Sequence, residues 1–301
     1  MRVFVTGATG YIGSAVVREL LGAGHQVLGL ARSDAAAAAL SAAGVEVRRG
    51  DLEDLDNLRA GAAAADGVVH AANQHISETT DPAARAGVER GAAEAIGAAL
   101  EGSGKPFVFT SGTLGLTPGR LSTEAGTGDL QGPGALRLPT ELAVIAMAER
   151  GVRSSAVRLA PLVHGEGDLK GFVPTLIGIA REKGVSAYVG DGTNRWPAVH
   201  RLDAARLYRL AVEAAPAGSR LHATDEEGVP FRDIAQAIGR RLRLPAVGIA
   251  PEEAAGHFAF LARLVTIDNP VSSALTRDRL GWKPEQPGLI ADLGQGHYFG
   301  N

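Results

Sequence analysis

Cysteine is absent from this chain of 301 residues, and aromatic residues make up only 5% of it. Without cysteine, the chain cannot form disulfides, thiolate zinc sites or iron–sulfur clusters, and it has no cysteine nucleophile. No apolar run approaches the roughly 20 residues that a membrane helix needs. The first apolar stretch, residues 3–5, is too short for a signal peptide. We therefore expect a cytoplasmic protein with no membrane partner.

An excess of one charge is also lacking. The chain has 30 lysines and arginines against 33 aspartates and glutamates, and its formal net charge is -3. Proteins that bind nucleic acids through phosphate contacts need a basic surface, so we expect no nucleic-acid partner. The hydrophobic content of 45% is that of an ordinary globular protein. The length suffices for one large α/β domain or two modest ones.

Glycine and alanine are abundant, and the first 160 residues alternate short β-branched runs with helical stretches. This alternation is typical of right-handed βαβ units around a parallel sheet. The predicted strands are Val3–Thr6, Gln26–Leu30, Val45–Arg48, Gly67–His70, Phe107–Thr110 and Ser154–Leu159. The predicted helices are Tyr11–Leu21, Asp34–Leu40, Asp54–Ala63, Ala83–Leu100 and Leu138–Arg150.

After Pro161 the pattern loosens. Helices are expected at Phe172–Lys183, Leu202–Ala214, Phe231–Leu242 and Pro251–Leu261, and strands at Ser186–Val189 and Leu221–Thr224. We predict an α/β fold in which residues 1–165 form a doubly wound parallel sheet. Residues 166–301 are expected to form a smaller α/β lobe, partly interleaved with the first, and a cleft is expected between the two.

A glycine-rich segment, residues 6–13 (TGATGYIG), follows the first strand and opens the first helix. Gly7 permits a tight turn, Gly10 lets a pyrophosphate approach the backbone, and Gly13 allows helix and strand to pack closely. The N–H groups at the start of the helix are free to bind the anion. In this context the pattern predicts a Rossmann-type dinucleotide site that includes Gly7, Thr9, Gly10, Tyr11, Ile12 and Gly13.

This loop resembles that of the extended or atypical branch of the short-chain dehydrogenase/reductase superfamily, which includes nucleotide-sugar epimerases and dehydratases. Other segments that resemble the family follow in order along the whole chain: 50–52, 68–72, 107–112, 157–165, 198–205 and 280–284. The resemblance implies that NADP or NAD is the cofactor and that a small molecule is the substrate.

The resemblance also implies roles for individual residues. Asp51 would accept a hydrogen bond from the adenine amino group, although an Asp before a helix also serves as a cap. Leu52 would lie beside the adenine ring. Further cofactor contacts would come from Ala71 and Ala72 under the ribose and pyrophosphate, from Thr110, and from the strand-six segment Leu159, Ala160 and Pro161 beside the nicotinamide.

The end of the second strand bears on which dinucleotide binds. NAD-binding relatives carry an acid for the ribose 2′-hydroxyl at the position of Ala31, and alanine cannot accept that hydrogen bond. Arg32 follows, with Ser33, and a guanidinium there can bind a 2′-phosphate with two hydrogen bonds. An exposed loop charge is the alternative reading of Arg32. The missing acid and the adjacent Arg together favour NADP over NAD.

The tyrosine–lysine pair on which most relatives depend for proton transfer is missing. Alignment on Glu141 and Arg158 places Pro133 where the tyrosine belongs and Arg137 where the lysine belongs. Proline has no group that could donate a proton, and arginine does not titrate near neutral pH. Arg137 can still contact the nicotinamide ribose, or else it is a solvated charge at the start of the helix. Gly112 stands where the family has its catalytic serine.

Replacement groups would have to come from loops near the strand ends. Ser111 and Thr113 flank Gly112 and can orient a substrate carbonyl, and His164 follows the sixth strand and titrates near pH 7. A structural role is the alternative for His164. The other candidates for proton donation are His75, Glu78, Glu166, Asp168, Trp196 and His200. The spacing of His164, Glu166 and Asp168 superficially resembles a metal cluster, but ligands at helical spacing are absent and we predict no metal site.

Three functions remain open. The first is an NADP(H)-dependent oxidoreductase that transfers hydride to or from a small carbonyl, imine or activated alkene. The second is an enzyme like the nucleotide-sugar epimerases and dehydratases, whose reactions depend on the missing tyrosine. The third is a non-catalytic sensor of NADP. Because relatives often pair the helices that follow strands four and five, and both are rich in small residues here, we also expect a homodimer.

Overall fold

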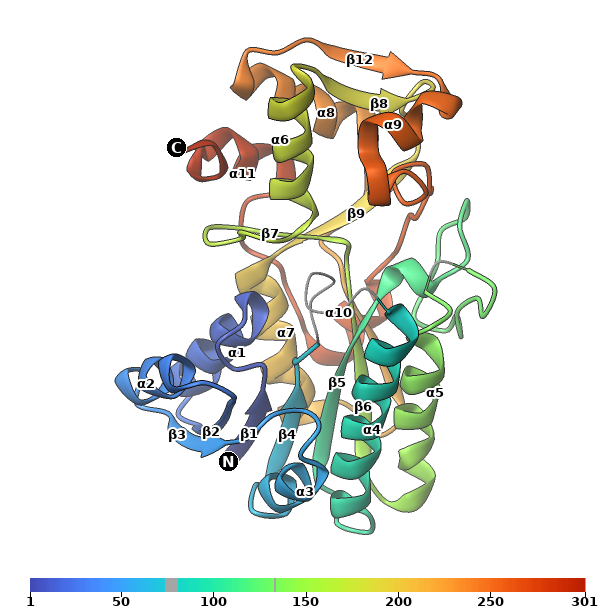
Figure 1. Ribbon diagram of the computed structural model, residues 1–301. Coiled ribbons are helices and arrows are strands. Elements are labelled where there is room, and N and C mark those ends of the chain that lie inside the picture. Colours follow the sequence, from blue (N-terminus) through green and yellow to red (C-terminus); the bar gives the residue numbers. More distant parts are fainter. Residues whose placement is uncertain (74–80, 133, 301) are drawn as a thin grey trace.

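A parallel sheet forms the lower half of the molecule (Figure 1). Within residues 1–73, 81–132 and 134–300, which the computed structural model describes, it has seven strands in the order β3-β2-β1-β4-β5-β6-β10. The strands are β1 (Arg2–Thr6), β2 (Gln26–Ala31), β3 (Glu46–Arg49), β4 (Gly67–His70), β5 (Pro106–Gly112), β6 (Arg153–Leu159) and β10 (Ser219–Ala223). The order reverses between β1 and β4. Ligands of such sheets bind in the crevice outside the carboxyl ends of the strands, at this switch point.

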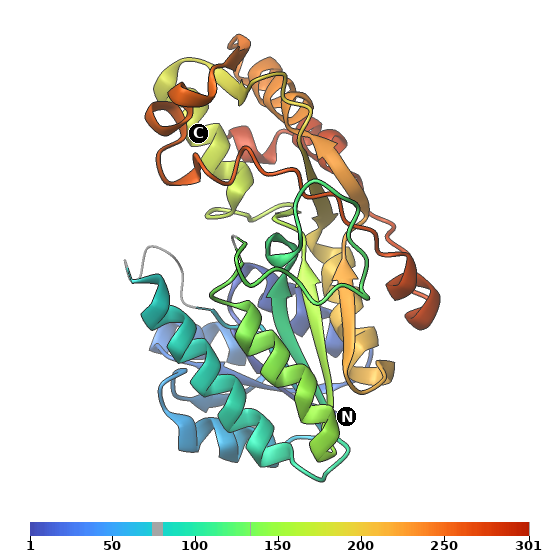
Figure 2. The ribbon, with the colours of Figure 1, turned by 90° about the vertical axis from the view of Figure 1, so that its right-hand side faces the viewer.

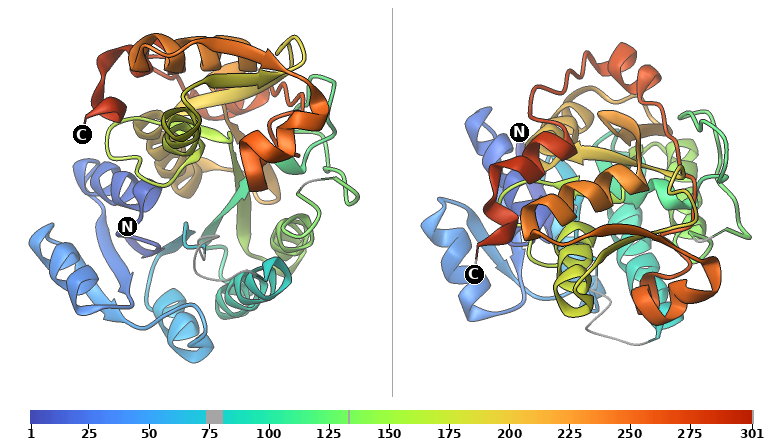
Figure 3. Two further views of the ribbon diagram at one scale, coloured as in Figure 1. Left: turned by 45° about the horizontal axis from the view of Figure 1, so that its top comes forward. Right: turned by 90° about the horizontal axis from the view of Figure 1, so that it is seen from above.

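Helices cover both faces of this sheet (Figure 3, left). One face carries α1 (Tyr11–Gly22), α2 (Asp34–Ala42) and α7 (Arg201–Ala214), and the other carries α3 (Leu55–Ala63), α4 (Pro82–Leu100) and α5 (Leu138–Ala146). Each face has its own apolar core, because both sides of β1, β4 and β5 are built from buried apolar residues. The predicted Rossmann-type doubly wound sheet is confirmed.

The seventh strand comes from the C-terminal half of the chain. The predicted strand Leu221–Thr224 corresponds to β10, which pairs in parallel with β6, from Ser219 opposite Ser155 to Ala223 opposite Leu159. The C-terminal half of the chain therefore contributes one strand to the main sheet. The helix before it, α7, packs against α1 and against β5 and β6. The chain thus leaves the main sheet after β6 and returns to it by α7 and β10.

The upper part of the molecule in Figure 1 contains two small sheets, β11-β9-β7 and β12-β8. Its core is a row of aromatic rings: Trp196 contacts Phe231 edge to face at 5.3 Å between centroids, and Phe231 contacts Phe258 at 6.2 Å. The elements are β7 (Leu162–His164), β8 (Ser186–Val189), β9 (Arg195–His200), β11 (Glu226–Pro230), β12 (Ala246–Ile249), α6 (Phe172–Lys183), α8 (Phe231–Leu242), α9 (Ala254–Phe258) and α11 (Leu289–Gln295), while α10 (Ala274–Leu280) packs beside α7 and β10.

Two sequence predictions for this half differ from the structure. The helix expected over Pro251–Leu261 is α-helical only in α9, because Ala259 adopts a φ of 49° and breaks it. The strands β7, β9, β11 and β12 and the helices α10 and α11 were not predicted. None of the helices in the described part of the chain has the length and apolar character to cross a membrane.

Candidate functional site

A cleft of about 1500 Å³ lies at the carboxyl ends of the main sheet, under the C-terminal part of the chain. Pockets for one small molecule usually measure roughly 300–1,000 Å³, so this cleft has room for a dinucleotide and a second molecule. Every residue that the sequence assigned to the cofactor lines it: Gly7, Thr9, Gly10, Tyr11, Ile12, Gly13, Arg32, Ser33, Asp51, Leu52, Ala71, Ala72, Thr110, Arg137, Leu159, Ala160 and Pro161.

The glycine loop keeps its backbone bare on the cleft side. Gly7 has a φ of 69°, and a Cβ on it would lie 2.7 Å from the backbone nitrogen of Ala72. A Cβ on Gly13 would collide with the carbonyl oxygen of Gly7. Gly13 is therefore needed for the start of α1 to pack closely against the loop. Gly10 caps α1 without any side-chain acceptor for the first amides of the helix. The loop therefore fits an anionic pyrophosphate.

Asp51 lines the cleft at the loop that leads into α3. Oδ1 of Asp51 accepts hydrogen bonds from the backbone nitrogens of Glu53 at 2.9 Å and Asp54 at 3.1 Å. Asp54, rather than Asp51, is the N-cap of α3. Asp51 thus shapes the loop with one oxygen while it lines the cleft.

The end of β2 is basic. Ala31 is buried, and Arg32 and Ser33 line the cleft beyond it, where the hydroxyl of Ser33 caps α2 by accepting from Ala36. Sequence reasoning missed Arg49 on β3, which pairs in register with Ala31. Its guanidinium donates to the carbonyl oxygen of Ser33 and to Asp34 at 2.7 Å. The register of β2 and β3 therefore brings a second arginine beside Arg32 and Ser33.

Arg137 lines the cleft and is held by a carboxylate that the sequence analysis did not single out. Its Nε and Nη2 donate to the two oxygens of Glu89, at 3.1 and 2.5 Å, and Nη2 also donates to the carbonyl oxygen of Thr110 at 2.9 Å. Burial alone would lower the pKa of Arg137, but the charge and hydrogen bonds of Glu89 raise it above its usual value. Arg137 is thus a permanent cation in the cleft.

Ser111 lines the cleft, but its hydroxyl is engaged. Oγ donates to Glu141 at 2.5 Å, and the same carboxylate pairs with Arg158 through Nε and Nη2, the latter at 2.6 Å. Glu141 and Arg158 are both buried. Since its single proton points at Glu141, Ser111 can offer a substrate only an acceptor.

Thr113 is engaged in the same way. Its hydroxyl donates to Oδ1 of Asn269 at 3.1 Å, while Nδ2 of Asn269 donates back to the carbonyl oxygen of Thr113. This pair ties the loop after β5 to the segment before α10. Pro133, expected in the tyrosine's place, lies outside the described residues.

His164 is not brought to the cleft. It is buried, its Nδ1 lies 2.9 Å from Oδ2 of Asp292 on α11, and its ring contacts His200 edge to face. The structure therefore favours the structural role for His164 over the role of proton donor that the sequence suggested. His200 caps α7, and Trp196 belongs to the aromatic core. Of the remaining loop candidates, Asp168 lines the cleft, Glu166 does not, and His75 and Glu78 lie outside the described residues.

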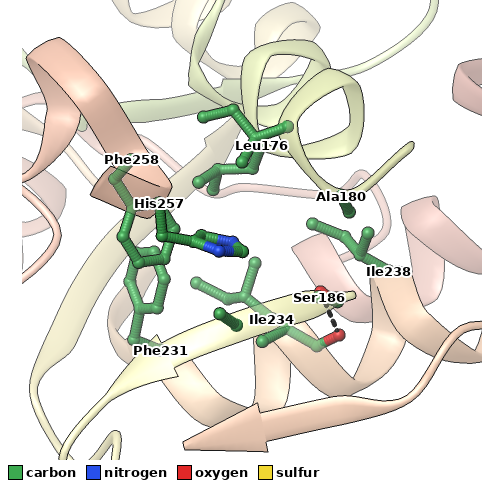
Figure 4. A pocket seen from close by; sticks show the side chains of 11 residues that line it. Leu176, Ala180, Ser186, Phe231, Ile234, Ile238, His257 and Phe258 are labelled. Carbon is green, nitrogen blue, oxygen red and sulfur yellow. Dashed lines mark hydrogen bonds between the residues drawn. The ribbon is translucent and has the colours of Figure 1, made fainter. Parts of the chain in front are cut away.

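A second, much smaller cavity lies in the upper lobe (Figure 4). Its volume is about 10 Å³, enough for one water molecule. The imidazole of His257 points into it between Leu176, Phe231 and Phe258. Across the described residues, 1–73, 81–132 and 134–300, no group of three or more His, Asp or Glu side chains is arranged to hold a metal ion.

The sheet order, the glycine loop and the cleft define a dinucleotide-binding protein of the α/β class. Residues 3–222 match the model of the NAD dependent epimerase/dehydratase family, and the chain belongs to this family. The resemblance to extended short-chain dehydrogenases found in the sequence is thereby confirmed, and the protein has the fold of an NAD(P)-dependent enzyme.

Comparison with individual proteins gives the following likenesses. The chain is 48% identical to an uncharacterised protein of Schizosaccharomyces pombe over 99% of its own length and 100% of that protein's. It is 31% identical to a 2-alkyl-3-oxoalkanoate reductase of Stenotrophomonas maltophilia, over 82% and 77% of the two chains. A dTDP-glucose 4,6-dehydratase structure from Streptomyces venezuelae, at 20% identity, superposes with a TM-score of 0.78 over 99% and 98%.

Proposed function

We propose that this protein is an NADP(H)-dependent oxidoreductase that transfers hydride between the nicotinamide and a small carbonyl, imine or activated alkene. The observation that carries the proposal is that one cleft of about 1500 Å³ is lined both by the glycine loop and by the basic end of β2. This volume leaves room for a substrate beside a dinucleotide. The residues that would hold the cofactor are those assigned from the sequence except Arg137, which lies beside Gly112. The cofactor would supply the hydride, and this chain supplies position and charge.

The charges around the end of β2 support NADP over NAD. No acid stands at Ala31 to accept from a 2′-hydroxyl, and Arg32 and Arg49 flank Ser33. A guanidinium can form two charge-assisted hydrogen bonds to a phosphate, and such bonds are the strong ones. Asp34 offsets part of this charge through its ion pair with Arg49.

The outer part of the cleft supports a substrate with an apolar body. Large apolar side chains from three separate segments project there: Leu136 is 52% exposed, Leu169 83% and Phe260 60%. Leu114, Leu116, Phe172 and Leu264 line the same cleft. Exposed apolar residues that gather around one cleft mark a binding site more often than single ones do. The likeness to a reductase of 2-alkyl-3-oxoalkanoates also agrees with such a substrate.

Two other functions stay open. Family membership supports an epimerase or dehydratase reaction, but the sequence resemblance puts Gly112 and Arg137 at the positions of the family's serine and lysine. The loss of those groups supports a sensor that binds NADP without turnover.

We also propose a homodimer through α4 and α5, which lie side by side on one face (Figure 2) and carry small exposed residues such as Ala98 and Ala146. A light-scattering mass near that of one 30.9 kDa chain would reject the dimer.

The experiment that tests the proposed function is NADPH oxidation in a panel of carbonyls, preformed iminium ions and polarised alkenes. We expect absorbance at the NADPH band to fall with at least one class, and most rapidly with iminium ions or polarised alkenes, which need less acid assistance. NADPH binding without oxidation by any class would support the sensor instead. A Gly10→Val variant, which blocks the loop, is the control for background reduction.

A further inference from the structure

The guanidinium of Arg137 is held in one orientation. Glu89 accepts hydrogen bonds from its Nε and Nη2, and the carbonyl oxygen of Thr110 accepts a further hydrogen bond from Nη2. The Glu89 side chain is only 3% exposed, whereas that of Arg137 is 35% exposed, so the pair has one buried and one open side. A bidentate pair of this kind fixes the plane of the guanidinium.

The third nitrogen of the fork, Nη1, has no hydrogen-bond acceptor among the described residues, although it carries two N–H donors. Arg137 lines the cleft together with Ser111, Gly112 and Thr113. The hydroxyls of Ser111 and Thr113 already donate to Glu141 and Asn269. Nη1 is therefore a charged donor still free at this point of the cleft.

Nη1 also lies close to the place where a side chain on Gly112 would begin. A Cβ built on Gly112 would lie 3.9 Å from Nη1 and 3.8 Å from the carbonyl oxygen of Leu159, with nothing closer. Gly112 has the extended backbone of an ordinary residue, with a φ of -149°. A Cβ therefore fits beside Gly112 in ordinary van der Waals contact, and Nη1 borders that position.

We propose that Nη1 of Arg137 is a catalytic hydrogen-bond donor, which holds the reacting oxygen of a carbonyl substrate in the space beside Gly112. The proposal rests on the proposed function. In the reduction, the carbonyl carbon accepts a hydride from the reduced cofactor, which is oxidised, and the π-electron pair moves to the oxygen. The resulting alkoxide is stabilised by Nη1–H and takes its proton from water in the cleft.

This role differs from the one that the sequence suggested for Arg137. A contact to the nicotinamide ribose would strengthen cofactor binding, whereas a donor to the developing alkoxide lowers the barrier and leaves cofactor affinity unchanged. Arginine stabilises the charge without giving up its proton, so the donor remains charged over the whole working pH range.

The test compares Arg137→Lys, which keeps a cation beside Glu89 but removes the fork, with Arg90→Lys on the exposed side of α4. We expect Arg137→Lys to lower kcat/KM for a carbonyl substrate by about tenfold to a thousandfold, the range seen when one oxyanion donor is removed. The Kd for NADPH, followed by its fluorescence, should change less than threefold. Adding Gly112→Ser to Arg137→Lys should recover part of the activity, because its hydroxyl enters the space beside Gly112. Arg90→Lys should match the wild type.

A binding measurement tests the same contact without turnover. Benzoate offers an oxyanion on an apolar ring, and calorimetry of the NADP⁺-loaded protein should show its Kd rising at least tenfold in Arg137→Lys. Unchanged kcat/KM and benzoate affinity, or a loss confined to NADPH affinity, would overturn the proposal. If the wild type reduces no substrate, the proposed function fails, and the benzoate titration still decides whether Nη1 binds an oxyanion.

Discussion

Ser111 donates its hydroxyl hydrogen to the buried carboxylate of Glu141 at 2.5 Å. The same carboxylate is paired with Arg158. The Ser111 hydroxyl therefore supplies a further hydrogen bond to the buried charge of Glu141. Removing one partner of a buried charge costs more than the average hydrogen bond. The hydroxyl at the end of β5 thus serves the packing of α5 against β5 and β6.

Ser111→Ala should therefore affect stability more than chemistry. We expect the free energy of unfolding to fall by about 1.5–3 kcal/mol, as for hydrogen bonds to charged groups, and kcat to change less than threefold. Urea denaturation and steady-state kinetics measure the two quantities. Ser103→Ala, at a hydroxyl that donates to the carbonyl oxygen of Leu100 near the surface, is the matched control. A large loss of kcat with an unchanged free energy of unfolding would instead indicate that Ser111 takes part directly in catalysis.

Arg32→Ala should weaken NADPH binding selectively. Losing a charge-assisted hydrogen bond of about 1.5–3 kcal/mol predicts roughly a tenfold or greater rise in Kd. NADH affinity should stay the same, since NADH has no 2′-phosphate. Arg59→Ala removes an exposed arginine on α3 that pairs with Asp56 and does not line the cleft, and it should change neither affinity. Equal losses for both dinucleotides in Arg32→Ala would speak against a 2′-phosphate contact.

Stability should fall in mild acid because buried histidines resist protonation. Burial lowers the pKa of His70 to about 4, and the same cause lowers those of His200 and His222 to about 4. Between pH 6.5 and 4 the unfolded chain binds protons at these imidazoles and the folded chain does not, so the free energy of unfolding decreases as the pH falls. Each such histidine contributes about 1.4 kcal/mol per pH unit in that window.

The variant His70→Asn isolates one of these contributions. Asparagine can keep a hydrogen bond to Thr6, whose hydroxyl lies 2.8 Å from Nδ1 of His70, but it does not titrate. Its free energy of unfolding, measured by urea denaturation, should decrease less steeply than that of the wild type between pH 6.5 and 4. Identical slopes would mean that the folded protein protonates His70 at its ordinary pKa.

Phe260→Ala should impair the binding of substrates that have an apolar chain. If a chain buries the ring, losing about 1.5–3 kcal/mol of burial predicts a rise in KM of roughly tenfold or more. A short substrate that does not reach the outer cleft should keep its KM. Leu130→Ala removes an exposed leucine that does not line the cleft, and serves as the control. Equal effects on long and short substrates would place the apolar chain elsewhere.

The parts of the fold that follow from local patterns could be predicted from the sequence. The glycine loop sits between a strand and a helix, and the strands of the main sheet are short apolar runs separated by helices of standard length. The helices α6 and α8 and the strand β8 have the predicted boundaries. Such elements are specified by residues within one or two turns of each other.

The parts that depend on distant contacts could not be predicted. The strand β7 has three residues and exists because it pairs with β9, whose paired residues come 36 positions later in the chain. His164 follows the sixth strand as expected, but its direction is set by Asp292, 128 residues further along the chain. Nothing near Arg137 in the sequence indicates that Glu89, on another helix, orients it. The same holds for Thr113 and Asn269.

The central claim, that this cleft binds NADP for hydride transfer, is tested most directly by calorimetric titration of the wild-type protein with NADPH and with NADH under the same salt conditions. The basic end of β2 predicts that NADPH binds at least tenfold more tightly than NADH. Equal affinity for the two dinucleotides, or tighter binding of NADH, would contradict the account.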